Sequence, residues 1–207
     1  MISWFIQHGR AFPWRDTDNA FHVFIAEVLL RQTQADRLVA PYLELLARYP
    51  NVETLASANV DELRHWFKPL GLVKRADRLV EASRLIAEHH GGSVPHKLNT
   101  LLSLPGLGIY SAQAILCLAF NERVTMIDES SGRLLRRFLG TVSHRPAYSD
   151  KQLLKVASSL LPGQSYREFN LGLLDLAAKF CHARTPACGS CPLLQLCNFG
   201  TATVGEA

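Results

Sequence analysis

The chain has 207 residues, 48% of them hydrophobic, and carries a formal net charge of +4. It is long enough for one large domain or two small ones, and its mild basic excess permits an anionic partner without requiring one. No stretch reaches the apolar length of a membrane span, and the N-terminal MISWFIQHGR lacks the layout of a secretory signal. We therefore expect a cytoplasmic protein without a membrane partner.

The first notable element is FIAEVLLRQTQ, residues 24–34, which extends back to Asn19 as a helix that is apolar on more than one face. Such a helix belongs in a core. Its single acid, Glu27, must find a partner, become neutral or have a chemical role. An ion pair with Arg31, four residues on, is the simplest structural explanation.

Helical periodicity continues along the chain, with apolar residues three or four apart. The clearest runs are 36–48, 74–90, 110–120, 131–139 and 150–161. The β-like pattern is confined to VTMI at 124–127. The sequence therefore predicts an all-α fold.

LPGLG at 104–108 predicts a tight turn between a short helix, 97–103, and a helix beginning near Tyr110. Gly106 and Gly108 can take positive φ and allow close backbone approach. Amides at the start of the second helix, with the hydroxyl of Ser111, suit a nucleic-acid phosphate. A simple helix connection that needs glycine only to turn explains the same residues.

Four cysteines cluster near the C-terminus with the spacing C-x6-C-x2-C-x5-C: Cys181, Cys188, Cys191 and Cys197. In a reducing compartment this clustering predicts a metal site rather than disulfides. The spacing suits either an iron–sulfur cluster or structural zinc. Cys117, alone in an apolar run, is expected to be a small buried hydrophobe.

Taken together, FPWR at 12–15, LPGLGIYSAQAIL, MIDESSGRLLRR and the cysteine tail resemble the helix-hairpin-helix DNA glycosylase superfamily, in its iron–sulfur branch. The resemblance implies a two-lobed fold with the active site in the cleft between the lobes. A six-helix barrel domain would span 18–124, with its hairpin at 97–119, and 1–17 with 125–207 would form the cluster domain. It also implies a [4Fe–4S] cluster on the four cysteines.

The resemblance assigns catalytic roles to two carboxylates. Asp128 matches the family's aspartate, whose charge stabilises the sugar cation as the N-glycosidic bond breaks. Helix N-capping is its structural alternative. Glu27 matches an acid that protonates the departing base in adenine and mismatch-specific thymine glycosylases. Ser130 departs from the family pattern, which usually has Asn at this position, and Glu129 adds a second acid beside Asp128.

Tyr110 takes the position where strand-cleaving members carry a lysine that forms a Schiff base. We therefore expect a monofunctional enzyme without lyase activity. Two loops resemble the family's DNA wedges: Arg31, Gln32 and Thr33 in one, and Leu72 in the other. The charges beside Leu72 (Lys74, Arg75 and Arg78) are expected either to contact phosphates or to form a solvated helix face.

The resemblance implies base excision repair of double-stranded DNA containing a mismatch, by a monomer associated with the nucleoid. We favour thymine or uracil opposite guanine, because LLPGQSYREFNLGLLDL resembles the short thymine glycosylases. RQTQA instead resembles adenine glycosylases, which act on adenine opposite guanine or 8-oxoguanine. A non-catalytic binder of distorted DNA is the alternative of another class, and the unusual DESSG segment favours it.

Overall fold

A computed structural model describes residues 1–31 and 33–205. Its regular structure is helical, and no strand forms within the described residues, so the predicted all-α fold is confirmed. None of the helices in this part of the chain combines the length and apolar character that crossing a membrane requires.

The segment 124–127, which resembled a strand, is extended without a partner strand. The side chain of Asn170 replaces that partner: its Oδ1 accepts from the amide of Met126 at 3.0 Å. Its Nδ2 donates to the carbonyl of Val124 at 2.8 Å. One buried amide side chain thus satisfies the polar groups that a neighbouring strand would satisfy.

Contacts divide the chain into two compact units. The central unit is Ala11–Glu122, and the split unit combines Met1–Arg10 with the residues from Arg123 onward. Residues 11–17, expected in the cluster domain, group with the central unit. The division into a six-helix barrel domain (18–124) and a cluster domain (1–17 with 125–207) stays a prediction.

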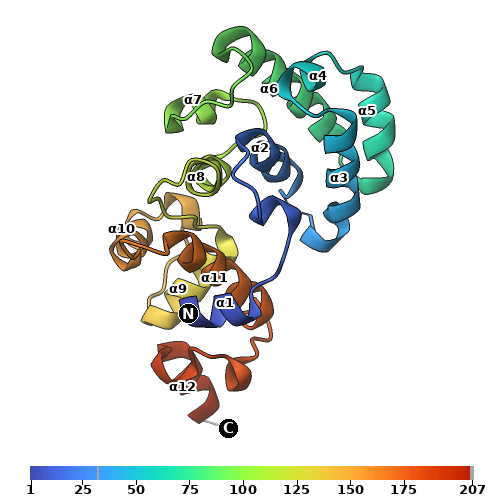
Figure 1. The fold of residues 1–207 in the computed structure, drawn as a ribbon. Coiled ribbons are helices and arrows are strands. Elements are labelled where there is room, and N and C mark those ends of the chain that lie inside the picture. Colours follow the sequence, from blue (N-terminus) through green and yellow to red (C-terminus); the bar gives the residue numbers. More distant parts are fainter. Residues whose placement is uncertain (32, 206–207) are drawn as a thin grey trace. The chain divides into compact units, whose positions relative to one another are not determined.

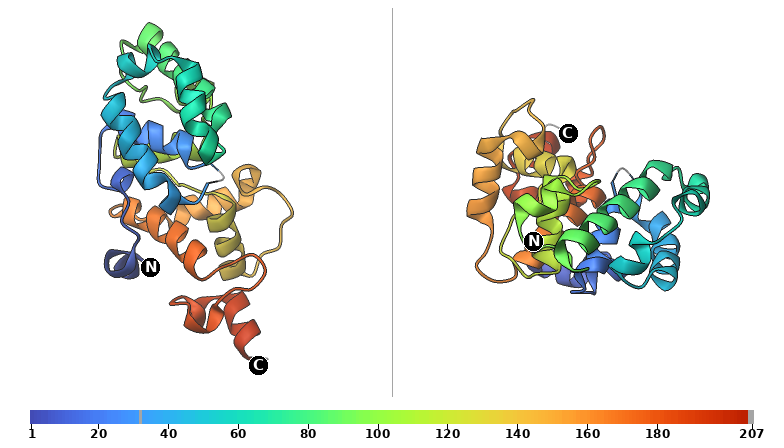
Figure 2. Two further views of the ribbon diagram at one scale, coloured as in Figure 1. Left: turned by 90° about the vertical axis from the view of Figure 1, so that its right-hand side faces the viewer. Right: turned by 90° about the horizontal axis from the view of Figure 1, so that it is seen from above.

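The central unit is built around α2, which packs against α3, α6 and α8, while α4 and α5 pack on α6 (Figure 1). Figure 2 shows α5 and α6 side by side. The helices are α2 (Ala20–Leu29), α3 (Val39–Arg48), α4 (Val52–Ala56), α5 (Val60–Phe67), α6 (Val73–His90), α7 (Leu98–Ser103) and α8 (Ile109–Leu118). Helix α2 begins after Asn19, whose Oδ1 accepts from the amides of Phe21 and His22 and so caps it.

The split unit packs α11 against α1 and α9, with α10 and α12 also against α9. Its helices are α1 (Ile2–His8), α9 (Glu129–Leu139), α10 (Lys151–Leu160), α11 (Tyr166–Lys179) and α12 (Asn198–Gly205). Arg10 fixes the end of the N-terminal segment to α11, because its amide and its Nε each donate at 2.8 Å to the buried carboxylate of Asp175. The two ends of the chain therefore share one core.

Candidate functional site

Glu27 lies in the most deeply buried helix of the central unit and is itself only 5% exposed. Its neighbours along α2, from Phe24 to Leu29, are all buried apolar residues. The guanidinium of Arg31 donates to the carbonyl of Gly106 at 2.9 Å. An ion pair with Arg31 and a chemical role for Glu27 both stay predictions.

The hairpin between α7 and α8 forms as predicted, but its two glycines differ. Gly106 has φ +91°, a conformation that favours glycine, and a Cβ there would lie 3.2 Å from Cβ of Arg78. Gly108 is extended, with φ −121°, so the expectation of positive φ at this position is wrong. A Cβ at Gly108 would meet no atom within 4 Å. The bare backbone of Gly108 therefore faces open space, and no internal contact of the described structure explains its lack of a side chain.

Helix α8 places Tyr110 in its first turn, half-buried, on a helix that packs directly against α2 with its Glu27. Ser111 follows but is only 3% exposed. The expectation that its hydroxyl is presented to a phosphate is therefore corrected, because at this position the helix turns the side chain into the core. The backbone amides at the start of α8 remain as donors.

The loop after α2 is held by Arg75, a residue whose role the sequence did not reveal. Its Nη1 donates to the carbonyl of Leu29, at the last turn of α2, and to Oγ1 of Thr33 at 2.9 Å. The predicted contact residue Gln32 lies outside the described residues. Arg75 thus ties the loop that follows Glu27's helix to the start of α6.

Leu72, predicted as a wedge, is 4% exposed, so the structure does not present it at the surface. It lines a pocket whose other lining residues are Arg31, Gly71, Val73, Lys74, Arg75 and Arg78. The lining has four cationic side chains and no carboxylate. Burial, and then the charges of Arg31 and Arg78, lower the pKa of Arg75. Such a concentration of like charge favours an anionic partner.

Asp128 is the N-cap of α9 in the split unit. Its Oδ1 accepts from the amide and from Oγ of Ser131, each at 2.7 Å, while Oγ of Ser131 accepts from the amide of Asp128 at 2.9 Å. This reciprocal arrangement fixes the carboxylate at the positive end of the helix dipole. The predicted capping is confirmed, and since the cap uses Oδ1, it is compatible with a second role for Oδ2.

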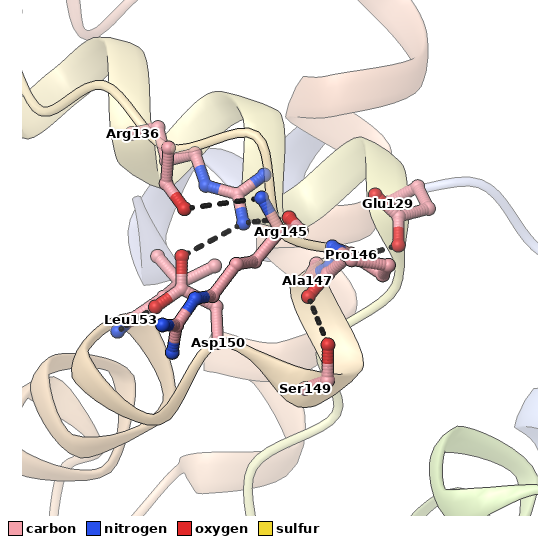
Figure 3. A network of polar contacts seen from close by, with 9 residues as sticks. Glu129, Arg136, Arg145, Pro146, Ala147, Ser149, Asp150 and Leu153 are labelled. Atoms are coloured by element: carbon pink, nitrogen blue, oxygen red, sulfur yellow. Dashed lines mark hydrogen bonds and ion pairs between the residues drawn. The ribbon is translucent and has the colours of Figure 1, made fainter.

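The acid beside Asp128 has a partner of its own. Oε1 of Glu129 accepts from the amide of Ala147 at 2.8 Å (Figure 3). The side chain of Glu129 therefore binds the segment that precedes α10. Ser130, which departs from the family pattern, is half-buried in the same turn.

The four clustered cysteines line one pocket of the split unit, with the apolar residues Leu134, Phe138, Phe180, Pro186, Leu193 and Phe199 among its other walls. Burial, and then the neighbouring sulfurs of Cys197 and Cys181, raise the pKa of Cys188. The amide of Gly200 donates to Sγ of Cys197 at 3.3 Å, and Nη1 of Arg137 donates to Sγ of Cys181 at 3.4 Å. These donors are positioned to neutralise negative charge on sulfur.

Four cysteines around one apolar pocket suit either a multinuclear iron–sulfur cluster or a structural zinc ion. Arg137 also donates to the carbonyls of His182 and Ala183, and so holds the loop that begins the cysteine tail.

Comparisons with known proteins agree with these features. Residues 25–159 match the family described as HhH-GPD superfamily base excision DNA repair protein, and residues 181–197 match the iron–sulfur binding domain of endonuclease III. The thymine/uracil-DNA glycosylase of Methanothermobacter thermautotrophicus is 35% identical over 92% of this chain and 86% of its own length. The adenine DNA glycosylase of Mycolicibacterium smegmatis is 35% identical over 93% of this chain and 66% of its own.

Among solved structures, a thermostable thymine-DNA glycosylase superposes with a TM-score of 0.90 at 33% identity, covering 97% of this chain and 93% of that one. These findings confirm the predicted resemblance, the DNA glycosylase class and the iron–sulfur cofactor. The chain belongs to the HhH-GPD superfamily of base excision DNA repair proteins and carries the iron–sulfur binding domain of endonuclease III.

Proposed function

We propose that the protein is a monofunctional DNA N-glycosylase that removes thymine or uracil mispaired with guanine from double-stranded DNA. The observation that carries this proposal is Glu27, a single carboxyl group buried in the apolar helix α2. The similarity to a thymine/uracil-DNA glycosylase over 86% of that relative's length supports the choice of base. We further propose that the protein acts as a monomer on DNA in the cytoplasm.

Asp128 would stabilise the transition state of bond cleavage. Breaking the N-glycosidic bond develops positive charge on the sugar, and a fixed carboxylate beside C1′ lowers the energy of that charge. The hydrogen bonds from Ser131 hold the group rigid, so no reorganisation is needed during the reaction. Oδ2, which the cap does not use, is the atom we assign to the sugar or to the attacking water.

Glu27 would supply the proton that the departing base needs. A pyrimidine anion is a poor leaving group unless a general acid or a hydrogen-bond donor neutralises its charge. An apolar environment favours the neutral form of a carboxylic acid, which is the form able to donate. The surroundings of Glu27 on α2 are of this kind.

Tyr110 would restrict the reaction to hydrolysis. A phenol cannot form a Schiff base with the sugar aldehyde, whereas the amine of a lysine at this position can. The product is then an abasic site in an intact strand. Its half-buried ring in the first turn of α8 suits contact with the extruded nucleoside.

The DNA backbone would contact the α7–α8 hairpin and the pocket of four cations. Gly108 offers bare backbone to a phosphate, and the first amides of α8 point the same way as the positive end of its dipole. Arg31, Lys74, Arg75 and Arg78 add sequence-independent affinity that falls as salt rises. We assign the [4Fe–4S] cluster to Cys181, Cys188, Cys191 and Cys197, as a structural element without a part in hydrolysis.

A panel of duplexes containing T:G, U:G, A:G and A:8-oxoguanine tests the proposal, with strand cleavage measured before and after alkali. We expect T:G and U:G strands to be cleaved only after alkali, because alkali reveals abasic sites. Cleavage without alkali would contradict the monofunctional assignment. Release of no base from any duplex would favour the non-catalytic binder.

Adenine is the second candidate substrate, favoured by the similarity to an adenine DNA glycosylase. The same carboxylates would serve, since adenine also leaves more readily when protonated. Adenine release from A:G or A:8-oxoguanine duplexes, with thymine and uracil retained, would establish it in place of the first.

A further inference from the structure

Helix α9, which begins at the proposed catalytic carboxylate, is fastened along one face to Arg145–Asp150, here called the clamp segment. Near the start of the helix, Glu129 accepts from the amide of Ala147 at 2.8 Å. Two turns later, Nη2 of Arg136 donates to the carbonyl of Arg145 at 2.7 Å and to Oδ2 of Asp150 at 2.9 Å. Figure 3 shows these contacts converging on the same short segment.

Between these two polar contacts the backbones approach closely. A Cβ on Gly132 would lie 2.5 Å from Cβ of Ala147, closer than atoms can pack, and Ala147 is fully buried. Residues 129, 132 and 136 are spaced three and four apart, so they share one face of the helix. The clamp segment therefore packs along one face of α9 over the first two turns of the helix.

The first turn of a helix is the part most prone to fray, because its amides have no partners within the helix. In α9 that turn carries Asp128, whose Oδ1 is bound by Ser131. Rotation of the turn would carry both residues with it. The bond from Glu129 to Ala147 ties the turn to a fully buried residue of the core, and so opposes that rotation.

We propose that Glu129 is a positioning residue: through the amide of Ala147 it fixes the first turn of α9 and thereby the direction of the Asp128 carboxylate. This inference rests on the proposed catalytic role of Asp128. The contribution of Glu129 lies in accepting a hydrogen bond, rather than in its charge. Misplacement of a reacting group by about 1 Å can cost about a hundredfold in rate, so a loss of this size or smaller is expected.

The test compares Glu129→Ala with Glu129→Gln, measuring single-turnover base release from T:G duplex together with DNA affinity and Tm. The alanine variant loses the acceptor and should release base about tenfold more slowly, with DNA affinity near that of the wild type and Tm lower by a few degrees, because the amide of Ala147 loses its partner. Glutamine keeps a carbonyl oxygen able to accept from Ala147, and should release base within about twofold of the wild-type rate. Glu53→Ala, which removes an exposed acid from the first turn of α4, serves as the matched control.

A second arm repeats Glu129→Ala in an Asp128→Asn background. A residue that acts only through the Asp128 carboxylate should have no further effect once that carboxylate is gone. Equal rates for wild type and Glu129→Ala, equal losses in the alanine and glutamine variants, or an undiminished effect in the double variant would each overturn the proposal. If the wild type itself releases no base from any mismatch, it is the proposed function that fails.

Discussion

The two proposed catalytic carboxylates lie in opposite environments, one in each compact unit. Glu27 is in the middle of α2, surrounded along the helix by buried apolar residues. Asp128 is at the end of α9, where an amide and a hydroxyl donate to it. These environments match the two proposed roles: apolar burial suits a proton donor, and a fixed set of donors suits a charge stabiliser.

Asp128→Asn removes the proposed charge-stabilising carboxylate of the pair and should have the largest effect. Base release should fall by about 10³-fold, because the charge that stabilises the sugar cation is gone. Asparagine is as good an N-cap as aspartate, so Tm should stay near the wild-type value. Single-turnover release and thermal unfolding measured on one preparation check both expectations. A near-normal rate would leave Asp128 as a cap only.

Glu27→Gln removes the proposed proton donor, the carboxyl group in the apolar helix. Release of thymine should therefore fall by about 10²-fold. A general acid matters less when the base leaves easily by itself. Release of 5-fluorouracil opposite guanine should therefore be reduced much less than release of thymine. Equal losses for the two bases would argue against proton donation by Glu27.

The cysteine tail belongs to the same unit as Asp128, so loss of one cysteine tests whether the stability of that unit depends on the cluster. Cys197→Ser should remove most of the iron and the brown colour, and lower Tm by about 10 °C or more. Cys117→Ala is the control, because Cys117 is buried in α8, away from the tail in sequence and in the other unit. It should keep the iron. A Cys197→Ser protein with full iron would contradict the assignment of this ligand.

The two hairpin glycines give a sharper contrast within the central unit. Gly108→Ala should fold normally, since its Cβ would meet no atom, yet bind duplex DNA about tenfold more weakly because the phosphate approach is blocked. Gly106→Ala should instead lower stability by about 1–2 kcal/mol, since its φ is +91°. Titration of labelled duplex and denaturant unfolding separate the two effects. Unchanged DNA affinity in Gly108→Ala would exclude close backbone contact there.

The smallest expected effect concerns the far end of the clamp segment. A hydrogen bond from Arg136, then one from the amide of Leu153, lower the pKa of Asp150 from 3.8 to about 2. The carboxylate therefore stabilises the fold fully above pH 3.8, and this contribution is lost as pH falls towards 2. Asp150→Asn should have a lower Tm than the wild type at pH 7, and the difference should shrink in acid. A difference that does not change with pH would contradict this assignment.

Most of the fold followed from periodicity. The run at 74–90 became α6, Val73–His90, and the one at 110–120 became α8, Ile109–Leu118. Helix positions are set by local spacing of apolar residues, which the sequence displays directly. The segment 124–127 was ambiguous because its extended backbone is satisfied by Asn170, a residue far along the chain.

The site was less predictable for a related reason. Whether Leu72 or Ser111 faces outward depends on how its helix packs, and both proved buried. Arg75 and Arg137 act on backbone carbonyls of distant segments, and such partners leave no pattern in spacing. The cysteine tail was recognisable because all its members lie within a few turns of chain.

Single-turnover release of thymine and of 5-fluorouracil opposite guanine, measured for the wild type and both carboxylate variants, tests the central claim most directly. We predict that Asp128→Asn slows the release of both bases to a similar extent, whereas Glu27→Gln slows thymine far more than 5-fluorouracil. The same ratio of thymine to 5-fluorouracil release in both variants would contradict the account of one proton-donating and one charge-stabilising carboxylate.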